Sequence, residues 1–137
     1  MGLDLSFAFV AGQEGDAMST TTNTDGWGMA AAWPMYRALQ DTPGVTAAPV
    51  WATRALERAD RYPAGTYDDT GLYLVPRAAW PDLMQRTLAE CLQTPLGPHD
   101  NPDLWKGADV SNLGYEFVQQ QLDRFPEYGF VLVEISI

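Results

Sequence analysis

The most constraining feature of the sequence is the apolar run at its C-terminal end. Residues 130–137 read FVLVEISI, and four apolar side chains follow one another before Glu134 interrupts the run. A half-buried strand alternates apolar and polar residues, whereas a strand covered on both faces is apolar at consecutive positions. The run therefore predicts a strand in the middle of a sheet, and the rest of the chain must cover both of its faces.

Two further strands are predicted. Residues 3–9 (LDLSFAF) alternate between large apolar and small or polar side chains, which is the pattern of a half-buried strand. Residues 72–75 (LYLV) form a short apolar run between Gly71 and Pro76, which suit the two ends of a strand. The chain thus has predicted strands at both ends and one between them.

Helices are predicted between these strands, because apolar side chains recur there with helical spacing. Pro34 and Pro81 suit first helical positions, and Ser111 suits the N-cap of the last helix. The predicted helical segments are residues 27–40, 49–62, 80–92 and 111–125. We therefore expect a single globular α+β domain over residues 1–137. It would have a small, mostly antiparallel sheet of three to four strands, including both terminal strands, packed against three to four helices.

Acidic residues are concentrated at the two ends of the chain. The first 36 residues carry four carboxylates and no basic side chain, and residues 37–94 carry seven acids against six arginines. From residue 95 onward, seven acids are balanced only by Lys106 and Arg124. If the two terminal strands are neighbours, these acidic blocks share one negative face. The net charge of −10 argues against direct binding to nucleic acid or to an anionic membrane.

The composition also indicates where such a chain resides. A single cysteine, Cys91, excludes an internal disulfide, and the first ten residues lack the basic start of a signal peptide. No apolar run approaches the ~18 residues of a membrane span. We expect a cytoplasmic protein, and seven arginines against one lysine suggest a GC-rich prokaryotic or phage genome.

Catalytic signatures are weak. His99, the only histidine, precedes Asp100 in a proline-rich loop, but no serine lies in the G-x-S-x-G context of a nucleophile. Cys91 shares the apolar face of its predicted helix, so we interpret it as a packing residue. The acidic loop around His99 matches neither an EF-hand nor a zinc pattern, although a weak calcium or magnesium site there stays open. No catalytic residue, metal site or cofactor is predicted.

Trp105 does not fit any periodic pattern. It lies in the acidic loop between Asp103 and Lys106, where an exposed tryptophan would suit an interface anchor. The alternative is that Leu104 and Trp105 fasten the loop to the core.

These observations favour an interaction module over an enzyme. Its acidic face would bind a basic surface on a partner macromolecule, as an inhibitor, an immunity protein or a nucleic-acid mimic does. Glu14 and Asp16 are further candidates for that face, in addition to a main set of predicted contact residues. That main set comprises Asp100, Asp103, Trp105, Asp109, Glu116 and Asp123. The alternatives are a small-ligand or metal-dependent enzyme that uses the His99–Asp100 loop, and a subunit whose C-terminal strand pairs with another chain.

Overall fold

The computed structural model describes residues 4–10, 17–20, 31–49, 51–52, 71–96, 98 and 101–136. The strands in this part of the chain are β1 (Asp4–Val10), β2 (Ala17–Thr20), β3 (Thr46–Ala47), β4 (Leu72–Pro76) and β5 (Phe130–Ser136). The α-helices are α2 (Ala32–Asp41), α4 (Trp80–Gln93) and α5 (Glu116–Arg124), and the 3-10 helices are η2 (Arg77–Ala79) and η3 (Val110–Leu113).

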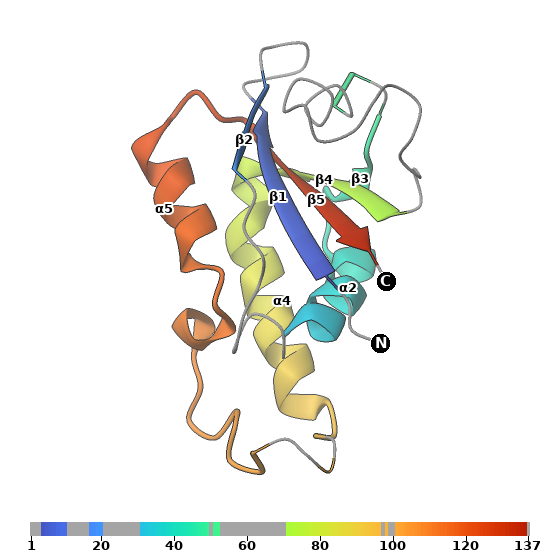
Figure 1. Ribbon diagram of the computed structural model, residues 1–137, viewed down its shortest axis with the longest axis vertical. Helices are drawn as coiled ribbons and strands as arrows, with labels where there is room; N and C mark the ends of the chain where they lie inside the picture. Colours follow the sequence, from blue (N-terminus) through green and yellow to red (C-terminus); the bar gives the residue numbers. More distant parts are fainter. Residues whose placement is uncertain are drawn as a thin grey trace.

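The strands form one sheet in the order β2-β1-β5-β4-β3, and every neighbouring pair is antiparallel. Helices α2, α4 and α5 all contribute to the apolar core on one face of this sheet (Figure 1). The predicted α+β class is therefore confirmed. The two outermost strands, β2 and β3, are short, and periodicity alone did not predict them.

Strand β5 occupies the middle of the sheet, as its apolar run predicted. Val131 and Val133 belong to the core on the helical face, whereas Leu132 belongs to a second apolar cluster on the opposite face. The neighbour of β5 on one side is β1, with Phe7 opposite Val133. The predicted pairing of the two terminal strands is thus confirmed. Most acids of the N-terminal block lie outside the described residues, so a shared negative face stays a prediction.

Strand β1 differs from the half-buried strand that its alternation predicted. Phe7 and Phe9 face the helices, but Ala8 and Val10 on the other face are equally buried. The reason is long-range: Ala52 belongs, with residues of β4 and β5, to the apolar cluster that encloses this second face. A small apolar side chain such as Ala8 does not indicate in the sequence whether its face of the strand is buried. It belongs to the core only because another segment covers that face.

The predicted helix at residues 80–92 is confirmed as α4, with Pro81 in its first turn. Helix α2 begins at Ala32, before Pro34, which is tolerated because first-turn N–H groups have no partner within the helix. The predicted helix at residues 49–62 lies mostly outside the described residues.

The last predicted helix is divided in two. Asp109, not Ser111, is the N-cap of η3, and Gly114 then takes a left-handed conformation (φ 85°) that turns the chain into α5. Aspartate and serine are similarly favourable at the N-cap, so N-cap preference alone could not show which of Asp109 and Ser111 caps the helix.

Arg77 fixes the end of α5. Its guanidinium donates hydrogen bonds to the carbonyl oxygens of Leu122 (2.6 Å), Phe125 (2.7 Å) and Tyr128 (2.6 Å). The last carbonyls of a helix have no partner within the helix, and a positive charge there also complements the helix dipole. The backbone of Arg77 is held as well, since its N–H donates to the Gly129 carbonyl at 2.8 Å. One side chain thus joins the end of β4 to the C-terminus of α5.

We predict that Arg77→Met lowers the free energy of unfolding by about 2–3 kcal/mol, because three carbonyls lose a charged donor. Urea denaturation followed by circular dichroism measures this change. Arg86→Met is the matched control, since Arg86 forms only an exposed ion pair with Asp82 on the same helix, and its loss should cost under about 0.5 kcal/mol. Equal effects of the two substitutions would contradict the role given to Arg77.

Candidate functional site

The described acids of the C-terminal block lie on one stretch of chain, residues 101–127, which we call the acidic arm. Asp103, Asp109, Glu116, Asp123 and Glu127 are all exposed on it. Asp100, which was also predicted as a contact residue, lies outside the described residues, as do Glu14 and Asp16.

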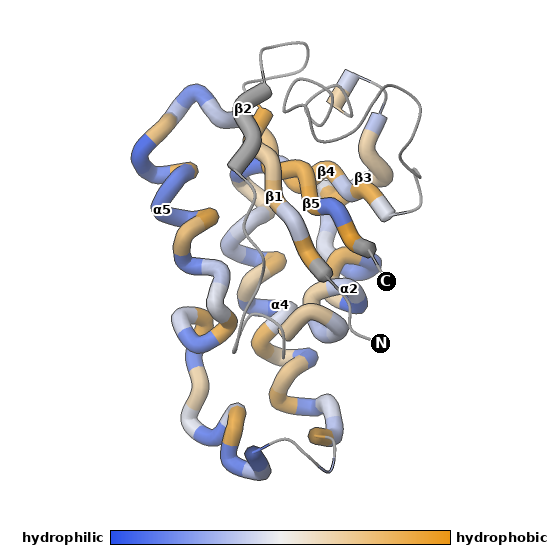
Figure 2. The backbone as a smooth tube through the Cα atoms, in the orientation of Figure 1, coloured by the Kyte–Doolittle hydropathy of each residue, from blue (hydrophilic) through white to orange (hydrophobic). Residues whose placement is uncertain are grey.

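Helix α5 displays a polar face outward. Glu116, Gln120 and Asp123 recur at helical spacing and are exposed, while Val118 and Leu122 on the inner face are buried. The tube over α5 is accordingly mostly hydrophilic, in contrast to the apolar strands beside it (Figure 2). Gln119 donates to the Asp123 carboxylate at 2.8 Å, which holds that carboxylate along the helix.

Charges are neutralised differently on the two sides of the helical layer. On α2 and α4, Arg37 pairs with Glu90 at 3.2 Å and Arg86 pairs with Asp82 at 3.0 Å. No carboxylate of the acidic arm forms such an ion pair within the described residues. The Arg124 guanidinium of the arm lies over the Phe125 ring, 5.3 Å from its centroid. The acidic arm therefore presents carboxylates available to a cationic partner.

Asp109 has a structural task within the arm. Its carboxylate accepts hydrogen bonds from the Ser111 N–H at 2.8 Å and from the Ser111 hydroxyl, and its own N–H donates to Asn112. The Ser111 hydrogen bonds lower the pKa of Asp109, because they favour the charged carboxylate. This capping box orders η3, so Asp109 shapes the arm in addition to charging it.

Trp105 is not an exposed interface anchor. Only 6% of it is exposed, and it belongs to the core that also contains Cys91 and Leu113. The tight turns at residues 101–108 fold this loop back, with hydrogen bonds from the Leu104 N–H to the Asn101 carbonyl and from the Ala108 N–H to the Trp105 carbonyl. Trp105 thus fastens the loop to the core, as the alternative interpretation had it.

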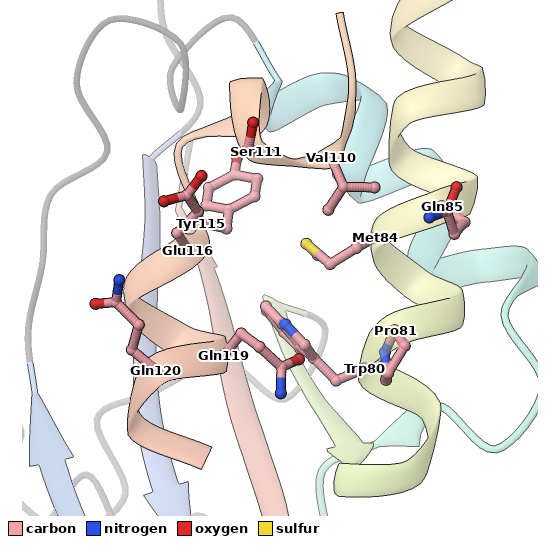
Figure 3. Close-up of a pocket in the computed structure, with 10 residues that line it drawn as sticks. All are labelled: Trp80, Pro81, Met84, Gln85, Val110, Ser111, Tyr115, Glu116, Gln119 and Gln120. Carbon is pink, nitrogen blue, oxygen red and sulfur yellow. The ribbon is translucent and has the colours of Figure 1, made fainter. Parts of the chain in front are cut away.

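A cavity of about 380 Å³ lies between α4 and the segment η3–α5 (Figure 3). Its floor consists of the buried residues Trp80, Met84 and Tyr115. Phe7 of β1 supports this floor from below, with its ring edge-on to Trp80 at 6.0 Å and to Tyr115 at 5.6 Å between centroids. Burial raises the pKa of Tyr115, so its phenol is neutral.

The rim of the cavity is polar. Gln85 on α4, Ser111 on η3, and Glu116 and Gln120 on α5 are exposed around it. Among the described residues that line the cavity, Glu116 is the only charged one, and it also belongs to the acidic arm. Sequence reasoning missed this cavity because its walls come from two separate segments, each of which reads simply as an amphipathic helix.

Cys91 is the packing residue that the sequence predicted. It is buried in the core on α4, and burial raises the pKa of its thiol to about 12. A thiol of this kind stays protonated near neutral pH and is a poor nucleophile.

The alternative site at His99 and Asp100 lies outside the described residues. Within the described part of the chain, no group of three or more histidine, cysteine, aspartate or glutamate residues is placed to hold a metal ion. No helix in that part is long and apolar enough to cross a membrane.

Comparison with known proteins finds no relative: no family model matches the sequence, and neither a curated protein nor a solved structure is significantly similar. The interpretation of this site therefore rests on its own geometry and charge.

We predict that Trp105→Ala lowers the free energy of unfolding by about 3 kcal/mol, because it leaves a cavity in the core. Leu92→Ala is the control, since Leu92 is 57% exposed and should change stability little. Thermal and urea denaturation of both variants measure the difference. A Trp105→Ala variant as stable as the parent chain would show that this side chain is not packed in the core.

We predict that Cys91 reacts slowly with a thiol reagent such as dithionitrobenzoate in the native protein and rapidly in urea. The pH dependence has a defined sign. The unfolded thiol ionises near pH 9.0 and the folded thiol near 12, so the stability contributed by burial is present below 9.0 and declines as pH rises toward 12. Cys91→Ala should remove this part of the alkaline decline. Rapid labelling of the native protein would contradict the buried position.

Proposed function

We propose that this protein is an interaction module that binds a basic surface of a partner macromolecule through its acidic arm. The observation that carries the proposal is the uneven neutralisation of charge. Both acids of α4, Asp82 and Glu90, pair with arginines of the same layer, whereas those of the acidic arm are exposed without an ion pair among the described residues. Exposed carboxylates on a rigid helix attract a basic surface and accelerate its association.

The proposed contacts are Glu116 and Asp123 on α5, with Asp103 and Asp109 on the preceding turns and Asp100 beside them in sequence. Trp105 supports these contacts from below, because it anchors the loop that carries Asp103. Basic surfaces of this kind commonly bind nucleic acid, so the protein would act as an inhibitor, an immunity protein or a nucleic-acid mimic. Its single cysteine and the high pKa of that thiol are compatible with a cytoplasmic protein.

We predict that the tagged protein captures a basic partner from a lysate of its source organism at low salt and releases it at high salt. Mass spectrometry identifies the bound protein, and binding kinetics with the purified partner follow. The test variant combines Glu116→Gln, Asp123→Asn and Glu127→Gln. It should reduce the association rate about tenfold, because steering depends on local charge.

The matched control combines Asp41→Asn, Asp82→Asn and Glu90→Gln, which removes the same charge from α2 and α4. It should leave the association rate within about twofold of the parent. Equal losses in the two triple variants would show that net charge alone acts, without a role for the acidic arm. Absence of any basic partner at low salt would overturn the proposal.

A further inference from the structure

The cavity between α4 and α5 contains a buried hydrogen-bond donor that is not satisfied. Trp80 is 0% exposed, and its Nε1–H has no hydrogen-bond partner among the described residues. The indole N–H is a donor only, and burying it without an acceptor is costly. Buried polar groups in native proteins are nearly always paired, so an unpaired donor at a cavity wall suits an acceptor on a bound molecule.

The residues around this donor restrict the kind of molecule that can carry the acceptor. Figure 3 shows the Trp80 indole and the Met84 thioether pointing into the same space, with Val110 and Tyr115 on the opposite side. Walls of this kind favour a flat apolar body that stacks on the ring and contacts the sulfur. The Met84 and Gln119 side chains flank the indole. Nε1 itself is buried, so a ligand reaches it only if one of these side chains moves.

The charges around the cavity further restrict the class of ligand that it can bind. No cation is among the described residues that line the cavity, and Glu116 at its rim repels anions, so a carboxylate or phosphate is a poor acceptor here. Lysine and arginine side chains of a basic partner are excluded as the deep occupant, because they carry no acceptor atom. We propose that this cavity binds a small, uncharged aromatic molecule with one hydrogen-bond acceptor, a ring nitrogen or a carbonyl oxygen, that accepts from Trp80 Nε1. This site does not depend on the function proposed for the acidic arm.

Quinoline and naphthalene test the proposal, since they share shape and size but only quinoline has an acceptor. The full chain, labelled with ¹⁵N, is titrated with each at mildly alkaline pH, where quinoline is uncharged, and the indole N–H resonances are followed. Quinoline should bind about tenfold more tightly than naphthalene and shift the Trp80 resonance downfield, which is the change expected when an unpaired donor gains an acceptor.

Two matched substitutions identify the donor. Trp80→Phe removes the N–H and should abolish the preference for quinoline, whereas Trp33→Phe, at an exposed tryptophan on α2, should preserve it. Each substitution also assigns its own resonance by removing it. If Trp80→Phe does not fold, the comparison of quinoline with naphthalene in the parent chain tests the proposal. Equal affinities for the two probes, binding that leaves the Trp80 resonance unmoved, or no binding of quinoline would each overturn the proposal.

Discussion

The position of α5 depends on the charged hydrogen bonds of Arg77. The helix has only nine residues, which is too short to be stable alone in water. Only two of its residues, Val118 and Leu122, are buried. The three carbonyls that accept from Arg77 define that position, and with it the outward direction of Glu116 and Asp123. The cavity beside Trp80 needs the same placement, because α5 forms one of its walls.

The acidic arm and the cavity share this one helix and meet at Glu116. Asp123 faces outward, whereas Gln119 lines the cavity, and the two side chains share a hydrogen bond of 2.8 Å. The floor of the cavity is apolar, whereas its rim and the outer face of α5 are polar. A short amphipathic helix held at one end can serve both surfaces, and Glu116 belongs to each.

Sequence patterns predicted the parts of the fold that are governed by local periodicity. The unbroken apolar run placed β5 in the middle of the sheet, and the spacing of apolar residues gave α4 nearly to the residue. Features that depend on contacts distant in sequence were missed. Trp105 has no periodic context, so only the return of its loop onto the core reveals that it is buried. Arg77 reads as an ordinary polar residue after a strand, because the carbonyls that it binds are more than forty residues away.

The distribution of charge along the sequence predicted where acids are concentrated, but it did not predict which charges are paired. The sequence showed that the C-terminal block has few compensating cations, but it could not show that Arg37 and Arg86 are already paired. Nor could it show an unsatisfied indole, since Trp80 suits the start of an amphipathic helix equally well with or without a partner. Its burial against Phe7, and the lack of an acceptor among the residues that the structure describes, become visible only in the folded chain.

The central position of β5 has a consequence for biosynthesis. This strand joins β1 to β4, yet it is the last of the described strands to leave the ribosome. Until it emerges, β1 and β4 each expose an unpaired edge, and their partner is not yet made. The sheet therefore closes only after residues 130–136 have been translated, and contacts of such long range form slowly. The nascent chain therefore passes through a stage with two unpaired strand edges, in which it is most prone to aggregate and most in need of chaperones.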